Sequence, residues 1–160
     1  MLDEDKTKEE LLQELLRLRQ QVSDFKNLEQ RHREAEEALK QQLSFLQKLI
    51  DTIPNPIFYK NVEGIYQGCN KAYEECLGRP KEEIIGKNVF SIFSPEMAKN
   101  YHEMDMELLR NPGFQAYETT VAYADGTVRD VILNKATFTN NDGTLAGFVG
   151  VIVDLSEHKK

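Results

Sequence analysis

The first 53 residues contain no glycine and no proline, although the chain of 160 residues has nine glycines and five prolines. These residues interrupt helices and form turns, so their absence favours one continuous helix. The first proline is Pro54 and the first glycine is Gly64. This break predicts a helix over residues 1–42 and a domain over residues 43–158, with residues 43–53 as a flanking helix.

Cysteine and long apolar runs are also scarce. Cys69 and Cys76 are the only cysteines and do not form a CxxC pair, which predicts two reduced thiols, one or both buried. No apolar run approaches the length needed to cross a bilayer, and the acidic N-terminus lacks the basic-then-apolar order of a signal peptide. We therefore expect a cytoplasmic protein without membrane insertion.

Positive charge and catalytic motifs are lacking too. The net charge is −7, whereas nucleic-acid binding relies on clustered lysine and arginine, so nucleic acid is not expected as the main partner. There is no glycine-rich phosphate loop, no HExxH and no Cys/His cluster with metal-ligand spacing. Nothing singles out a Ser–His–Asp set. We therefore expect neither enzymatic activity nor a metal site.

The segment without glycine carries apolar residues at alternating steps of four and three. A stripe this narrow needs a partner helix, so it predicts a coiled coil, most simply a parallel homodimer. The expected dimer interface consists of Leu11, Leu15, Leu18, Val22, Phe25, Leu39, Leu43, Leu46 and Ile50. Between the two apolar blocks the same register gives Glu29, His32 and Glu36, which predicts a weak middle. His32 is either a pH switch in this seam or a tolerated polar residue in a frayed segment.

Beyond residue 53, strand patterns alternate with helix start and stop signals. Asn70 can cap a helix that ends at Gly78, and Ser94-Pro95 can start a longer one ending near Arg110. Asp-Gly between β-rich runs indicates hairpins. The predicted strands are residues 56–60, 65–69, 114–123, 127–138 and 145–153, and the predicted helices are 70–77, 80–86 and 94–110. Five strands around a short helical insert make an α+β domain.

This order resembles the PAS family, and six short sequence words carry the resemblance. They are Asn-Pro-Ile-Phe-Tyr-Lys (55–60), Cys-Asn-Lys-Ala-Tyr (69–73), Leu-Gly-Arg-Pro-Lys-Glu-Glu-Ile-Ile-Gly-Lys (77–87), Ala-Asp-Gly-Thr-Val-Arg-Asp-Val (124–131), Asn-Asp-Gly-Thr-Leu-Ala-Gly (141–147) and Asp-Leu-Ser-Glu-His-Lys (154–159). The resemblance implies a PAS fold with a five-stranded antiparallel sheet and a helical insert, preceded by a coiled-coil signalling helix.

In PAS proteins, the Asp-Leu-Ser-Glu word at the end of the last strand begins a helix that leads to an output domain. Residues 154–160 would be the start of that helix, and Asp154 and Glu157 would take part in the signal relay. Family outputs include histidine kinases, cyclic-dinucleotide enzymes and chemotaxis modules. We therefore expect a sensory module that dimerises and relays ligand or partner binding to an output domain absent from this chain. The alternatives are a spacer without ligand and a heme-based gas sensor.

The resemblance also allows two cofactors to be considered. Flavin-binding light sensors of the family carry a reactive cysteine where this chain has Val89, so a flavin–thiol adduct is not expected. Heme sensors place their ligating histidine seven residues after the proline that starts the long helix, and His102 stands at that spacing from Pro95. Those sensors also carry an arginine where this chain has Tyr117. The cofactor therefore stays open, with heme as one alternative.

An organic ligand is the third option. Alternate residues of strand 127–138 face opposite sides, and the family suggests that the face with Lys135 lines the pocket. The pocket candidates are Lys135, Tyr117, Thr119, His102, Met106, Val131, Leu133, Phe148 and Ile152. A buried ammonium group needs a partner, so Lys135 predicts either a small anionic metabolite or an internal Glu as its counterion. Alternatively, Lys135 reaches water at the strand end.

Overall fold

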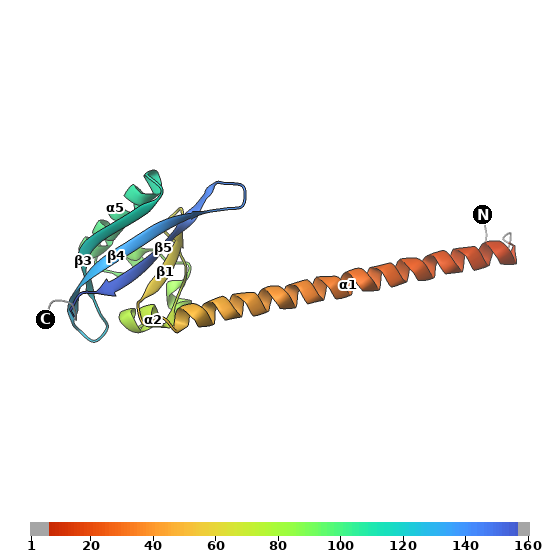
Figure 1. Ribbon diagram of the computed structural model, residues 1–160, viewed down its shortest axis with the longest axis horizontal. Coiled ribbons are helices and arrows are strands. Elements are labelled where there is room, and N and C mark those ends of the chain that lie inside the picture. Colours follow the sequence, from red (N-terminus) through yellow and green to blue (C-terminus); the bar gives the residue numbers. More distant parts are fainter. Residues whose placement is uncertain (1–6, 157–160) are drawn as a thin grey trace. The chain divides into compact units, whose positions relative to one another are not determined.

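The computed structural model describes residues 7–156, so the predicted relay residue Glu157 lies outside the described residues. The chain consists of two compact units, Met1–Leu46 and Gln47–Lys160. Helix α1 (Lys8–Asp51) is continuous, as the absence of glycine and proline predicts (Figure 1). None of its residues is buried, and the heptad residues from Leu11 to Leu46 are 40% to 65% exposed. A single chain therefore leaves the apolar stripe uncovered.

The second unit is an α+β fold in which four helices separate two strands from three. The elements are β1 (Ile57–Asn61), β2 (Tyr66–Cys69), α2 (Lys71–Leu77), α3 (Lys81–Ile84), α4 (Val89–Ile92), α5 (Pro95–Arg110), β3 (Phe114–Ala122), β4 (Val128–Thr139) and β5 (Leu145–Asp154). The strands form one antiparallel sheet in the order β2-β1-β5-β4-β3. This arrangement confirms the predicted fold class.

Local signals set the helix boundaries of the insert. The Asn70 side chain caps α2 by accepting a hydrogen bond from the Tyr73 N–H, and Gly78 ends this helix with a left-handed φ of 69°. Ser94 caps α5 and Pro95 occupies its first turn. These boundaries were predicted from the sequence. Helix α4 was not, because its four residues are too few for a periodic pattern; only its cap, Asn88, signals it.

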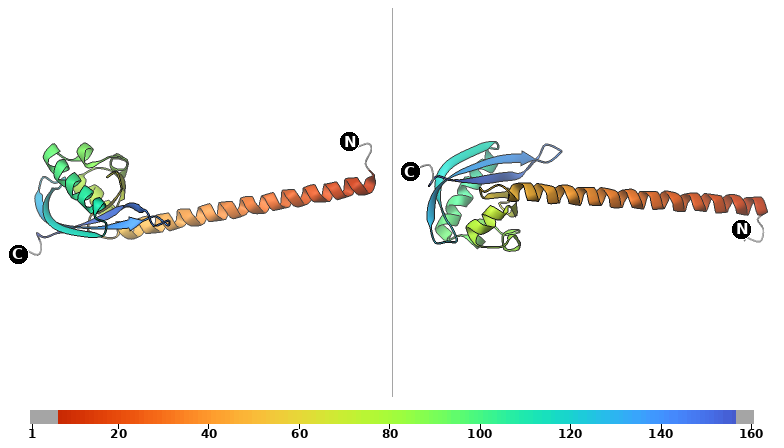
Figure 2. Two further views of the ribbon diagram at one scale, coloured as in Figure 1. Left: turned by 90° about the horizontal axis from the view of Figure 1, so that it is seen from above. Right: turned by 60° about the horizontal axis from the view of Figure 1, so that its bottom comes forward.

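The core lies between the sheet and the insert, whose helices cover one face of the sheet (Figure 2). On β4 and β5, the residues that are buried alternate with residues that are half-exposed. The largest side chains buried here include Tyr66, Tyr73, Phe148 and Ile84. Two of the other fully buried side chains are Lys60 and Lys135, and they lead to the candidate site.

Candidate functional site

Two lysines and one aspartate meet inside the core, and we call these three residues the lysine–aspartate centre. The Lys60 Nζ lies 2.7 Å from Asp105 Oδ2, and the Lys135 Nζ lies 2.6 Å from Asp105 Oδ1. All three side chains are at most 3% exposed. Lys135 also donates to the Tyr117 hydroxyl at 2.9 Å. A single carboxylate therefore serves two buried ammonium groups.

Three separate elements bring the centre together. Lys60 lies on β1 two residues after Phe58, so both point to the core face of the sheet. Lys135 lies on β4 opposite Gly150 of β5. Asp105 belongs to the buried stripe of α5, which consists of Ala98, Tyr101, Asp105 and Leu108. These four residues are separated by three, four and three positions, a spacing that places Asp105 on the helix face that meets the sheet.

Charge and burial act in opposite directions on the two lysines. Burial lowers the pKa of Lys135, and the attraction of Asp105 only partly offsets it. Burial also lowers the pKa of Lys60, but two attractions outweigh it, so this pKa is raised. They come from the ionised form of Tyr66, which exists only at high pH, and from Asp105. Two ammonium groups and one carboxylate leave one positive charge in excess when all three are ionised. One carboxylate thus offsets the cost of burying two ammonium groups only in part.

Aromatic rings surround both ammonium groups. The Lys60 Nζ lies 4.5 Å from the ring centre of Tyr66 and 5.7 Å from that of Phe148. The Lys135 Nζ lies 5.6 Å from the ring centre of Phe148 and 4.9 Å from that of Tyr117. The negative face of an aromatic ring attracts a cation at such distances. The rings therefore supply part of the charge stabilisation that a single carboxylate cannot provide.

A small cavity of about 30 Å³ adjoins the centre. This volume is close to that of one water molecule. The cavity is lined by Phe58, Lys60, Tyr66, Tyr73, Leu77, Val89, Phe93, Tyr101, Asp105, Val121, Leu133, Lys135 and Ile152. Burial raises the pKa of Tyr66 and Tyr73, whose hydroxyls are 2.7 Å apart, so both stay neutral at neutral pH. The walls are therefore mostly apolar, with cationic groups at one side.

The predicted pocket residues divide into three groups in the structure. Lys135, Leu133 and Ile152 line the cavity. Val131 and Phe148 are buried in the same core, Tyr117 contacts Lys135, and Thr119 is half-buried opposite Val131 on β3. Their ligand-binding role stays a prediction.

Two predicted pocket residues lie elsewhere. The half-buried His102 packs against Phe90 with ring centres 5.3 Å apart and does not line the cavity. Met106 lies near the Gly64 turn: a Cβ at Gly64 would be 3.5 Å from its terminal methyl group. Neither residue belongs to the buried stripe of α5, which contains Tyr101 and Asp105. The ligand-binding role of His102 and Met106 stays a prediction.

The interpretation that Lys135 reaches water is wrong, because this residue is 1% exposed. Its internal counterion is Asp105 rather than a glutamate. Sequence reasoning missed Lys60 and Asp105, although a signal for each was present. Lys60 shares the strand face of Phe58, and Asp105 falls on the apolar stripe of α5. A charged residue at an apolar position is informative because burying it unpaired is costly.

The cysteines behave as structural residues. Cys69 and Cys76 are both free and buried, as predicted. Burial raises the pKa of each thiol to about 11. Such thiols stay protonated at neutral pH, so they are poor nucleophiles.

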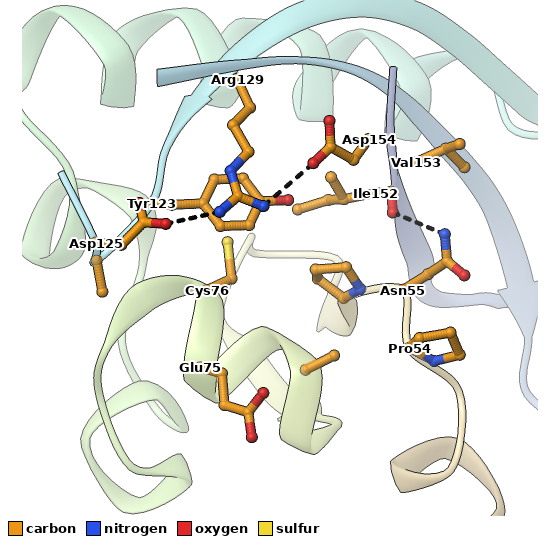
Figure 3. A pocket seen from close by; sticks show the side chains of 13 residues that line it. Pro54, Asn55, Glu75, Cys76, Tyr123, Asp125, Arg129, Ile152, Val153 and Asp154 are labelled. Carbon is orange, nitrogen blue, oxygen red and sulfur yellow. Dashed lines mark hydrogen bonds and ion pairs between the residues drawn. The ribbon is translucent and has the colours of Figure 1, made fainter. Parts of the chain in front are cut away.

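A second site lies where the last strand ends, and we call it the exit groove (Figure 3). It has a volume of about 500 Å³ and is lined by Pro54, Asn55, Pro56, Ala72, Glu75, Cys76, Tyr123, Ala124, Asp125, Arg129, Ile152, Val153 and Asp154. Arg129 lies over the Tyr123 ring, 4.0 Å from its centre. Its guanidinium donates to Asp125 at 2.7 Å and to Asp154 at 3.2 Å. This arginine thus joins the β3–β4 turn to the end of β5.

Asp154 is the predicted relay residue that the structure describes. Its Oδ1 accepts hydrogen bonds from the Ser156 hydroxyl at 2.6 Å and the Ser156 N–H at 2.9 Å. These hydrogen bonds and Arg129 lower the pKa of Asp154. The carboxylate therefore stays ionised and holds the first residues after β5 in a turn. Its role in a relay stays a prediction.

Comparisons with known proteins place this geometry in a family. The profile of the family described as the PAS fold matches residues 44–155. The chain therefore belongs to the PAS family, as its sequence words indicate. The PAS domain of BvgS from Bordetella pertussis has a similar structure, with a TM-score of 0.61 and 28% identity, covering 74% of this chain and 90% of that one.

Two curated relatives are sensor proteins. The aerobic respiration control sensor protein ArcB of Escherichia coli (strain K12) is 29% identical over 120 residues, which are 75% of this chain and 15% of ArcB. The virulence sensor protein BvgS of Bordetella bronchiseptica is 33% identical over 153 residues, 92% of this chain and 12% of BvgS. The chain thus spans less than a sixth of these relatives. It is a PAS module of the kind found in sensor proteins.

Two features are absent from residues 7–156. No helix there is long and apolar enough to span a bilayer. In the same range, no three His, Cys, Asp or Glu side chains gather into a group that could hold a metal ion.

Proposed function

We propose that this chain is a sensory PAS module that dimerises through α1 and relays an event in its core to an output domain of a longer protein. The observation that carries this proposal is the uncovered heptad stripe of α1. Its leucines are about half exposed in the single chain. Fully burying an exposed leucine is worth about 1.5–3 kcal/mol, so covering the exposed half of each one adds about half of that. Summed over the stripe, this is a strong drive for pairing. The relatives that are named sensor proteins support the sensory part.

The relay has a short physical route. Strand β5 lies between β1 and β4, the strands that carry Lys60 and Lys135. The same strand ends at Asp154, which Arg129 holds. A change at the lysine–aspartate centre would shift the strands on both sides of β5 and so the position of Asp154. Such a relay requires two states that bind the ligand with different affinities.

Light scattering of the purified chain tests the dimer. We expect twice the mass of the 160-residue chain, and a monomer for Leu15→Glu combined with Leu18→Glu, because charged residues oppose burial in the seam. The control is Gln13→Glu with Asn27→Asp, which adds the same charge at positions off the apolar stripe and should stay dimeric. A monomeric native chain, or a dimer that tolerates the glutamates, would contradict the coil.

The lysine–aspartate centre also favours a second candidate, a dimerisation spacer without ligand. The buried side chains of the core leave a cavity of only about 30 Å³ beside the centre. Mass spectrometry under native and denaturing conditions tests whether the chain is a sensor with a bound ligand or a spacer without one. Extra mass in the native spectrum supports a sensor that retains its ligand. A dimer without extra mass is expected for a spacer, and also for a ligand that exchanges during purification, which the binding experiment below resolves.

A further inference from the structure

When Lys60 and Lys135 are both ionised, the core holds more buried positive charge than its own carboxylate can neutralise. Asp105 accepts from both Lys60 and Lys135, at 2.7 Å and 2.6 Å. The hydroxyl of Tyr117, the other hydrogen-bond partner of Lys135, is neutral, because burial raises its pKa. An uncompensated ammonium group inside a protein is unfavourable, and an added anion would relieve it. The charge balance of the site therefore favours one negative charge from outside the chain.

The surroundings of the centre define the rest of such a ligand. The cavity beside the ammonium groups is lined mainly by aromatic and aliphatic side chains, among them Phe58, Tyr73, Phe93 and Leu133. A multiply charged or strongly hydrated anion would lose its water there without enough compensation. A single carboxylate on a small apolar body matches both parts of the site. Its oxygens can accept from an ammonium group while the body contacts the apolar walls.

Room for the apolar body has to come from the insert. The cavity of about 30 Å³ has the volume of about one water molecule, so a carboxylic acid fits only if the cavity widens. Val89 and Phe93 line the cavity. Val89 is the first residue of α4, and Phe93 is the C-cap that ends this helix. A helix of four residues has few internal hydrogen bonds and opens at low cost. The insert can therefore widen the cavity more easily than the sheet can.

We propose that the lysine–aspartate centre binds a small monocarboxylic acid, whose carboxylate pairs with Lys135 while Asp105 keeps Lys60. When both lysines are ionised, the bound acid brings the local charge of the centre from plus one to zero. This inference rests on the proposed sensory function and specifies the ligand class for it. It also explains why the core contains two lysines and one aspartate at positions where apolar residues could pack instead.

The test follows the lysine Nζ resonances of the full chain, labelled with ¹⁵N-lysine, by NMR. The probes are formate, acetate, propionate, butyrate, benzoate and phenylacetate, each compared with its neutral amide. We expect saturable shifts of the Lys135 and Lys60 signals with at least one acid, and binding at least about tenfold weaker for its amide. Equal binding of acid and amide, or no saturable shift with any acid, would overturn the proposal.

Two variants locate the binding charge. Lys135→Met leaves Lys60 and Asp105 as a neutral pair, so it should fold, and it should weaken binding of the acid by at least about tenfold. Lys99→Met removes a lysine from the exposed face of α5 and should leave binding unchanged. Unchanged affinity in Lys135→Met would place the acid elsewhere. The same titration in Leu15→Glu/Leu18→Glu measures ligand binding in a chain that should be monomeric. The proposed ligand and the proposed dimer can therefore be disproved independently of each other.

Discussion

The sequence Asp-Gly-Thr occurs in two turns of the sheet and forms the same hydrogen bonds in both. Asp125 Oδ1 accepts from the Thr127 hydroxyl at 2.6 Å and the Thr127 N–H at 2.9 Å. Asp142 accepts from Thr144 at 2.6 Å and 3.0 Å in the same way. The hydrogen bonds of Thr127, with help from Arg129, lower the pKa of Asp125 to about 2. Those of Thr144 lower the pKa of Asp142.

Replacing the threonine hydroxyl should therefore raise the aspartate pKa. We expect Thr127→Val to move the pKa of Asp125 from about 2 toward the ordinary value of 3.8, because the largest cause of the shift is lost. A carboxyl group with a folded-state pKa below its unfolded value stabilises the fold above about pH 4 and loses this contribution as the pH falls toward 2. The native chain should thus resist acid slightly better than the variant.

An NMR titration of the carboxyl carbons measures both aspartates at once. Thr144→Val is the matched variant, since it should raise the pKa of Asp142 and leave Asp125 unchanged. An unchanged pKa of Asp125 in Thr127→Val would show that the backbone N–H of residue 127 and Arg129, and not the threonine hydroxyl, keep this pKa low.

At the scale of elements, Asn70 connects three parts of the PAS unit. Its amide nitrogen donates to the carbonyls of Ile50 at 2.8 Å and Asn55 at 2.9 Å, and to that of Ile53 at 3.2 Å. Its oxygen accepts from the N–H of Ile57 at 2.8 Å and of Tyr73 at 3.1 Å. One fully buried side chain thus fixes the end of α1, the start of β1 and the start of α2.

Asn70→Ala should destabilise the PAS unit by about 3 kcal/mol, because it leaves several buried backbone groups without a partner. Asn70→Asp should cost at least as much, since its carboxylate faces three carbonyl oxygens. The comparison is Asn88→Ala, which removes the half-buried cap of α4 and should cost about 1 kcal/mol. Urea unfolding followed by circular dichroism measures each cost. Equal losses in Asn70→Ala and Asn88→Ala would reduce Asn70 to an ordinary helix cap.

At the scale of the whole molecule, the middle of the α1 seam carries charge instead of apolar contact. Glu29 and Glu36 are 54% and 66% exposed, and each pairs within its own helix, with Arg33 and His32. Exposed pairs of this kind contribute only a few tenths of a kcal/mol. In the proposed dimer this stretch adds little to pairing, so the two halves of the coil can shift relative to each other at low cost.

Glu29→Leu combined with Glu36→Leu should make the apolar stripe of α1 continuous through its charged middle. We expect the dimer dissociation constant to fall by at least about tenfold, because each added leucine buries apolar surface in the seam. Sedimentation at a series of concentrations measures the constant. Glu34→Leu with Gln41→Leu places the same residues off the stripe and should leave the constant unchanged. In the longer protein proposed above, the seam variant should also reduce signal output, and no change in either quantity would disprove the weak-seam hypothesis.

Local chemistry made much of this protein predictable. The absence of glycine and proline predicted the helix through residue 51, Asn70 and Gly78 marked the ends of α2, and the Asp-Gly turns marked the hairpins. Each of these signals acts within a few residues, through capping, backbone conformation or periodicity. The PAS fold class followed from their order along the chain.

The candidate site depended on tertiary structure. Lys60 and Asp105 are 45 positions apart in sequence, and Asp105 and Lys135 are 30 apart. Their meeting depends on the strand order, on the face that α5 turns to the sheet, and on which neighbour receives each charge. A sequence pattern showed that Lys135 shares a face with apolar residues, but it did not show which carboxylate lies opposite. Ion pairs between distant residues are decided by packing, because burial makes an unpaired charge costly and only the folded core determines which partner is within reach.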